Sequence, residues 1–185
     1  MTDEKIQELA GEFLDQYPLC EYFFLKTEEL TLTPEVKALC EQDTAVYGER
    51  RNVPPAPSSY DKCKAEIEKF ENAFLFDAVY EVDDAYDMER CEEARKTHAA
   101  MVRDLCSEFR SRFGEVMALS ISCDLCDDCP CPKKPCKCPE QKIVSMDSYG
   151  VQIMKTLADR DIMYDYGINT AIYFTLILFN GAEKC

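Results

Sequence analysis

The sequence predicts an α+β fold, or an α/β one, in which a mixed sheet of about four strands packs against helices. Runs of apolar residues at helical spacing alternate along the chain with short β-rich runs, a pattern typical of layered domains. Hydrophobic residues make up 46% of the 185 residues, which is enough for one buried core. A cysteine-rich segment at 123–139 directly follows the third strand-like run. We therefore expect a single domain over 1–185, with this segment as a loop after its third strand.

The first half of the chain is expected to contain three helices and one strand. Apolar residues recur at helical spacing near its start, where Thr2 or Asp3 can cap the helix. Thr33 and Pro34 suit the start of a second helix, and Ser59 suits the N-cap of a third. The expected elements are a helix over 3–16, a strand over 21–26, a helix over 33–40 and a helix from Ser59 to Phe70.

The second half is expected to contain the remaining three strands and the longest helix. Gly114 marks the end of that helix, and Cys91 and Cys106 lie near one of its faces as expected core thiols. Ser145 is a candidate cap for a later helical segment. The run TAIYFTLILF is apolar on both faces, so we expect a central, buried strand. The expected elements are a strand over 72–82, a helix from Tyr86 to Phe113, a strand over 115–122, a helical segment over 145–160 and a strand over 170–179.

The stretch CDLCDDCPCPKKPCKC, residues 123–138, holds six cysteines and three prolines within sixteen residues. The chain begins without a basic and apolar leader, and its apolar run at 170–179 is too short to cross a bilayer. We therefore expect a cytoplasmic protein with no membrane partner, whose thiols stay reduced. Because the prolines keep this segment out of helices and sheets, we expect a bound metal to organise its backbone.

The spacing of the cysteines favours an iron–sulfur cluster over zinc. Cys123, Cys126 and Cys129 recur every third residue, and Cys136 follows after six others, which gives the pattern C-x2-C-x2-C-x6-C. Three cysteines so spaced can take three corners of a cubane, and a more distant fourth can close it, so we expect a [4Fe-4S] cluster. Zinc is the alternative metal, held for example by Cys123, Cys126, Cys136 and Cys138.

The motif CDLCDDC followed by PC, then SMDSYGVQIMKT, then YGINTAIYFTLILF, resembles an uncharacterised family. This is the cysteine-rich "predicted metal-binding protein" family of anaerobic bacteria and archaea, a domain of unknown function. The resemblance covers most of the chain, and its C-terminal motifs are specific when they occur together in this order. It implies Cys123, Cys126, Cys129 and Cys136 as the ligands. Cys131 and Cys138 are then additional cysteines of the same segment, which could substitute for a ligand.

The family also has an N-terminal cysteine pattern, which the stretch CEQDTAVYGERRNVPPAPSSYDKC matches in part. Cys40 and Cys63 match cysteines of that pattern, whereas Asp43 and Val53 stand where it has cysteine. Asp43 could supply an oxygen ligand, but Val53 has no donor atom. The resemblance therefore implies a degraded second site, reduced to Cys40, Asp43 and Cys63, which we expect to hold no metal.

The strongly acidic composition of the chain indicates which classes of partner it can bind. It has 36 acidic and 21 basic residues, a net charge of −15, so we expect no nucleic-acid partner and a surface suited to a basic protein. No catalytic constellation is recognisable, and His98, the only histidine, is expected to be a surface or partly buried residue. We therefore expect a protein of electron transfer or redox partnership. The alternatives are a zinc-stapled interaction module and a reductase or sulfur-handling enzyme that uses the cluster.

Overall fold

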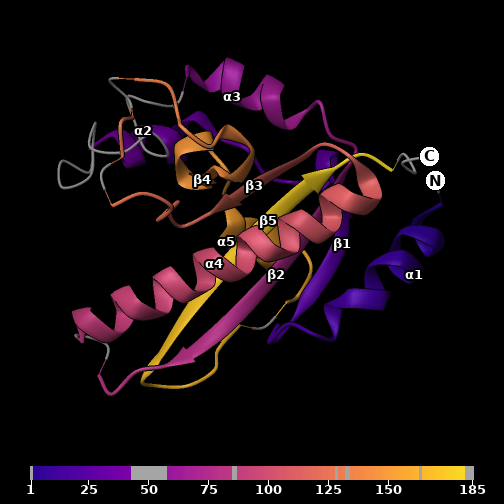
Figure 1. Ribbon diagram of the computed structural model, residues 1–185. Helices are drawn as coiled ribbons and strands as arrows, with labels where there is room; N and C mark the ends of the chain where they lie inside the picture. The colour runs from indigo at the N-terminus through magenta and orange to yellow at the C-terminus, as the bar shows by residue number, and fades with distance from the viewer. Residues whose placement is uncertain are drawn as a thin grey trace.

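A mixed five-stranded sheet forms the centre of the molecule, with the strand order β1-β2-β5-β3-β4 (Figure 1). The computed structural model describes residues 2–42, 58–84, 87–127, 129–131, 134–162 and 164–181. Its strands are β1 (Tyr22–Lys26), β2 (Asn72–Glu81), β3 (Val116–Ser120), β4 (Ile143–Ser145) and β5 (Thr170–Phe179). Its α-helices are α1 (Asp3–Leu14), α2 (Pro34–Gln42), α3 (Tyr60–Ile67), α4 (Met88–Phe113) and α5 (Ile153–Ala158). Its 3₁₀ helices are η1 (Thr27–Glu29), η2 (Pro139–Gln141) and η3 (Asp147–Tyr149).

The two longest strands, β2 and β5, pair antiparallel along their whole length, from Asn72 opposite Phe179 to Glu81 opposite Thr170. β1 pairs antiparallel with β2, β3 pairs antiparallel with β5, and β4 pairs parallel with β3. The last five residues of β5 are all buried, because helices cover both sides of this part of the sheet. The α+β class and the central position of 170–179 are confirmed. The sheet has five strands rather than four.

Helices cover both faces of the sheet, which gives three layers. Figure 1 shows α4 running across one face, where its Phe109 ring packs against Phe13 of α1 and Phe74 of β2, with centroids 5.4 and 5.1 Å apart. On the opposite face, Ile67 of α3 and Leu157 of α5 are buried in a second apolar cluster. Successive side chains of a strand point to opposite faces, so β2 and β5 supply both clusters.

The ends of the first and longest helices follow signals in the sequence. The Thr2 side chain accepts a hydrogen bond from the Lys5 amide at the start of α1. Asp87 does the same for the Arg90 amide at the start of α4. α4 ends at Gly114, whose φ of 88° lies in the left-handed region that favours glycine. The expected Thr2 cap and the Gly114 stop are therefore confirmed.

The segment 145–160 is helical in two short pieces, η3 and α5, rather than in one continuous helix, and the Ser145 hydroxyl accepts a hydrogen bond from the Ser148 amide at 3.4 Å at the start of the first piece. Ser145 ends β4, and the Met146 amide extends the pairing of that strand by donating to the Ser120 carbonyl at 3.0 Å. Gly150 then adopts a φ of 79°, which interrupts any helix at this point. Only α5 remains as an α-helix, because tertiary pairing with β3 outweighs the local helical pattern.

The remaining helices are short. Thr33 caps α2 as expected, since its hydroxyl accepts from the Val36 amide at 3.3 Å. Ser59 occupies the N-cap position of α3 but makes no side-chain capping bond, and that helix ends at Ile67 rather than Phe70. Within the described residues, no helix combines the length and the apolar character that crossing a membrane would need.

Candidate metal centre

The cysteine-rich loop, residues 121–142, is the connection between the parallel strands β3 and β4. Parallel neighbours need a long crossover, which in most proteins of this kind is a helix. Here the prolines prevent a long helix, and η2 is the only helical turn in the described part of the loop. The loop starts at the carboxyl end of β3, so its conformation determines how β4 reaches its place in the sheet.

Arg95 of α4 fixes the start of this loop. Its Nη1 donates to the Ser122 hydroxyl at 2.8 Å, and the Asp124 carboxylate accepts from both Arg95 and Ser122. Asp124 has a φ of 43°, in the left-handed region, which aspartate tolerates better than most residues. The side chains of Arg95, Ser122 and Asp124 therefore form a closed hydrogen-bonded cluster at the turn that carries Cys123, and we call this cluster the clasp.

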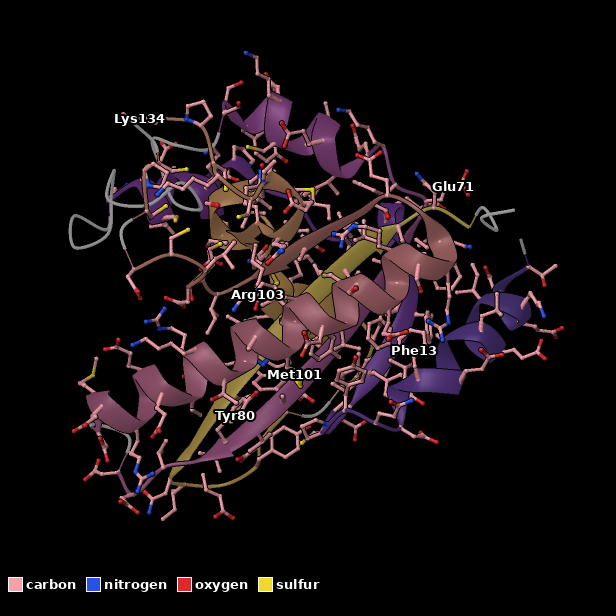
Figure 2. The ribbon with its side chains drawn as sticks, viewed as in Figure 1. Phe13, Glu71, Tyr80, Met101, Arg103 and Lys134 are labelled. Atoms are coloured by element: carbon pink, nitrogen blue, oxygen red, sulfur yellow. The ribbon has the colours of Figure 1, made fainter. Side chains whose placement is uncertain are left out.

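Two further arginines of α4 hold the loop along its course. Arg103 Nη1 donates to the Cys123 carbonyl at 2.7 Å, and Arg110 Nη2 donates to the Glu140 carbonyl at 2.7 Å. Figure 2 shows Arg103 on the side of α4 that faces the loop. Arg95, Arg103 and Arg110 recur at intervals of about two turns, so they share one face of the helix. The regular spacing of these arginines is visible in the sequence, but the loop groups that they contact are not.

The thiols of the loop lie near one another. Cys123, Cys126, Cys129, Cys136 and Cys138 are all half-buried. Desolvation raises the pKa of the Cys126 thiol, and the negative charges of Cys129, Cys123, Cys136 and Cys138 raise it further, in that order. The charges of the loop thiols therefore act on one another. A multivalent cation would relieve that repulsion by favouring the thiolate form of each ligand.

The donor set suits a metal that prefers sulfur, because iron–sulfur clusters and structural zinc are both held by several thiolates. Cys131 differs from the other thiols of the loop, since its side chain is buried, with 3% exposure. In the described part of the chain, no group of three or more His, Cys, Asp or Glu side chains has the geometry to hold a metal ion. The assignment of Cys123, Cys126, Cys129 and Cys136 as ligands stays a prediction.

The degraded N-terminal site is represented by Cys40 on α2 and Cys63 on α3, while Asp43 lies outside the described residues. Cys63 is fully buried, and its Sγ donates to the Ser58 carbonyl at 3.3 Å. Burial raises the pKa of the Cys63 thiol, although the nearby charge of Lys37 lowers it. Lys37 is itself buried, with 4% exposure. Its ammonium pairs with the Glu41 carboxylate at 3.3 Å, and the expected loss of this second metal site stays a prediction.

His98 was expected at the surface or partly buried. The structure corrects this, because the His98 side chain is completely buried on the side of α4 that faces the sheet. Its Nδ1 bonds with the Tyr80 hydroxyl at 3.2 Å, and its Nε2 with the Thr175 hydroxyl at 2.8 Å. The Thr175 hydroxyl in turn bonds with the Ser120 hydroxyl at 2.7 Å. Burial lowers the pKa of His98 to about 4, so the ring is neutral at physiological pH. It joins α4 to three strands of the sheet.

The two cysteines of α4 have different surroundings. Cys106 is buried, and burial raises the pKa of its thiol to about 12, so it is a core thiol as expected. Cys91 is half-buried, and its backbone carbonyl accepts a hydrogen bond from the Tyr173 hydroxyl at 2.9 Å. Neither position offers the electropositive, accessible setting that makes a cysteine reactive.

A comparison with known protein families matches residues 24–179 to the family described as "Predicted metal-binding protein (DUF2284)". The matched range contains the cysteine-rich loop, together with Cys40, Cys63 and the strands from β2 to β5. No curated protein and no solved structure matches the chain. Because the family match spans most of the sequence and agrees with the thiol-rich loop, the chain belongs to this family of predicted metal-binding proteins.

Proposed function

We propose that this protein holds a [4Fe-4S] cluster on Cys123, Cys126, Cys129 and Cys136, and that it transfers electrons to or from a protein partner in the cytoplasm. The observation that carries the proposal is that five half-buried cysteines lie on the one loop between β3 and β4, which arginines of α4 hold in place. Four thiolates in one loop are the ligands that such a cluster requires. When bound, the cluster would supply a reversible one-electron couple.

The residues around the loop would prepare it for this role. Arg103 and Arg110 hold its backbone from α4, and Arg95 holds the side chains of Ser122 and Asp124, so less conformational freedom remains to be lost when the thiolates take up a metal. Their positive charges also offset the negative charge of four thiolates. Positive charge near an anionic centre favours its reduced form, so these arginines would raise its reduction potential.

The charge of the whole chain supports a basic protein as the partner. With a net charge of −15, the molecule would attract a positively charged surface over a distance of about one Debye length, roughly 8 Å at physiological salt. Electrostatic attraction of this kind raises association rates more than it raises affinity, which suits a brief encounter for electron exchange.

A zinc-stapled interaction module is the second candidate function. The charge of Cys138 also acts on Cys126, as a zinc site made of Cys123, Cys126, Cys136 and Cys138 would require. Zinc has no redox chemistry in proteins, so in that case the metal would only fix the loop and the position of β4.

Metal analysis after anaerobic purification separates the two candidates. We expect brown protein that absorbs broadly at about 400 nm and carries about four iron and four acid-labile sulfide per chain. Colourless protein with about one zinc per chain and no sulfide would contradict the cluster and support the zinc module.

A further inference from the structure

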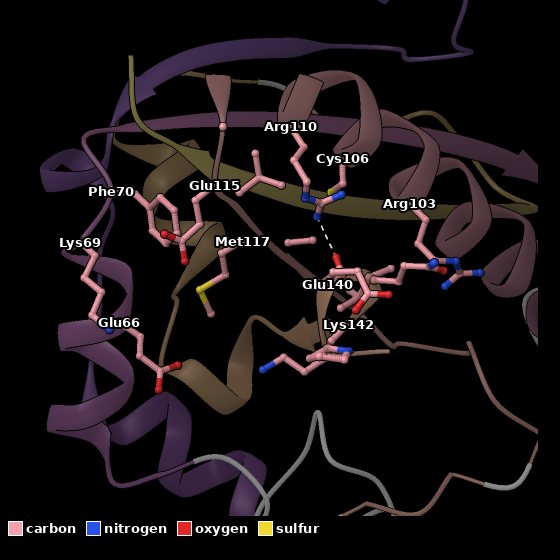
Figure 3. Close-up of a pocket in the computed structure, with 16 residues that line it drawn as sticks. Glu66, Lys69, Phe70, Arg103, Cys106, Arg110, Glu115, Met117, Glu140 and Lys142 are labelled. Atoms are coloured by element: carbon pink, nitrogen blue, oxygen red, sulfur yellow. Dashed lines mark hydrogen bonds between the residues drawn. The ribbon is translucent and has the colours of Figure 1, made fainter. Parts of the chain in front are cut away.

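A cavity of about 530 Å³ lies next to the cysteine-rich loop (Figure 3). It is bounded by the C-terminal half of α4, the end of α3, the start of β3, the last residues of the loop, 139–142, and Ile143 of β4. Figure 3 shows Phe70 and Arg110 on opposite sides of the cavity, with Met117 of β3 between them. Its volume falls in the range of roughly 300–1,000 Å³ that is typical of small-molecule sites.

The charged groups inside the cavity are mainly positive, in a chain whose net charge is −15. Three cations line it in half-buried positions, Arg103, Arg110 and Lys142, against one half-buried carboxylate, Glu66. That carboxylate already accepts a hydrogen bond from the Tyr149 hydroxyl at 2.8 Å. The other charged residues that line the cavity, Lys69, Glu115 and Glu140, are exposed to solvent, which screens their charges. Among the described lining residues, the half-buried charge is therefore mainly positive, which suits an anion.

Both arginines retain hydrogen-bond donors for a ligand. A guanidinium has five N–H donors. Among the described residues, Arg103 uses one nitrogen for the Cys123 carbonyl, and Arg110 uses one for the Glu140 carbonyl. Both positive charges act on the Cys106 thiol, so the two groups flank the same part of the wall. Since burial keeps that thiol protonated, it offers no nucleophile, and the cavity is suited to binding rather than to covalent chemistry.

We propose that this cavity is a binding site for a small organic anion, a carboxylate with an apolar body. The carboxylate would pair with Arg110 and Lys142, because a guanidinium matches the two oxygens of a carboxylate. The apolar body would lie against Phe70 and Met117, which line the same cavity. The proposal does not depend on which metal the loop holds.

Ligand binding and the loop are connected through the same side chains. Arg103 and Arg110 line the cavity and also hold the backbone at Cys123 and Glu140. A ligand that forms hydrogen bonds with either guanidinium therefore alters the hydrogen bonds that hold the loop. By thermodynamic linkage, the state of the loop then changes the affinity for the ligand by the same factor.

The test is a calorimetric titration of the full-length protein, purified with its metal, with two probes that share one apolar body. These are 3-phenylpropanoate, an anion, and 3-phenylpropan-1-ol, which is neutral. We expect the carboxylate to bind about tenfold more tightly than the alcohol, the usual effect of a hydrogen bond to a charged group. Equal affinities for the two probes, or no binding of the carboxylate at millimolar concentration, would overturn the proposal.

Two variants locate the binding site. Lys142→Gln removes one interior charge without breaking any side-chain bond among the described residues, and Arg110→Gln removes a second. Each should weaken binding of the carboxylate about tenfold and leave binding of the alcohol unchanged. The control is Lys155→Gln on α5, whose ammonium pairs with Asp159 outside this cavity, and it should bind like the parent. If Lys142→Gln and Lys155→Gln have the same effect, the anion binds elsewhere and the proposal is wrong.

Discussion

Cys123, Cys126, Cys129 and Cys136 each fill one position of the proposed four-thiolate shell, so serine at any one of them leaves that shell open. We expect each of these four substitutions to remove most of the metal from the purified protein, as measured by elemental analysis. Cys138→Ser is the matched control, because Cys138 is equally half-buried in the same loop, and it should keep the metal content of the parent. If Cys138→Ser empties the site and Cys129→Ser does not, the zinc arrangement is correct.

His98 makes the stability of the protein depend on pH in a defined window. Burial lowers the pKa of its imidazole from 6.5 to about 4. Between these two values the unfolded chain binds a proton that the folded protein does not, so stability falls as the pH falls. Above pH 6.5 the ring is neutral in both states and contributes no pH dependence. The protonation of His98 should therefore lower the unfolding free energy by about 3 kcal/mol as the pH falls from 6.5 to 4.

The variant His98→Gln isolates this contribution, because the carboxylates titrate equally in both proteins. At pH 7 the variant should be less stable than the parent by about 1–3 kcal/mol, since Tyr80 and Thr175 lose a buried partner. At pH 4.5 the difference should shrink by about 2 kcal/mol, because only the parent has lost stability by protonation. Urea unfolding at both pH values measures this, and an unchanged difference would show that His98 does not titrate as described.

Among the helices, α4 has a second role besides covering the sheet, because its arginines hold the loop. Arg95→Gln should open the clasp with Ser122 and Asp124 and lower the metal affinity of the loop about tenfold, the usual effect of losing a group that supports metal ligands. Faster loss of metal to a chelator measures this effect. The control is Arg90→Gln on the same helix, whose side chain forms, among the described residues, an exposed ion pair with Glu93 at 3.7 Å. Equal rates in both variants would contradict the role of Arg95.

The elements that could be predicted from the sequence are the long ones with a clear hydrophobic pattern. β2, β5 and α4 each carry a signal over ten or more residues, and the cysteine spacing marked the loop between β3 and the next element. β4 could not be predicted in this way, because it has three residues and forms by pairing with β3 across a long connection. The contacts of Arg103 and Arg110 join residues far apart in the chain, so no local pattern reveals them.

The degraded N-terminal site determines how many metal centres the whole molecule can carry. We expect the double variant Cys40→Ser, Cys63→Ser to keep the same metal content per chain as the parent. Two thiolates leave a metal half-coordinated. Elemental analysis of both proteins is the measurement. A lower content in the double variant would mean that the chain carries a second centre with substitute ligands.

β4 is one of the two edge strands of the sheet, and it follows the cysteine-rich loop that connects it to β3. By pairing with β3, it covers a row of backbone amide and carbonyl groups that would otherwise face solvent. An uncovered row of this kind is a template for a strand of another molecule. A chain whose loop has lost its metal would therefore be prone to edge-to-edge aggregation. In a cell, keeping the loop loaded would protect the pool of this protein from self-association, whatever the metal does chemically.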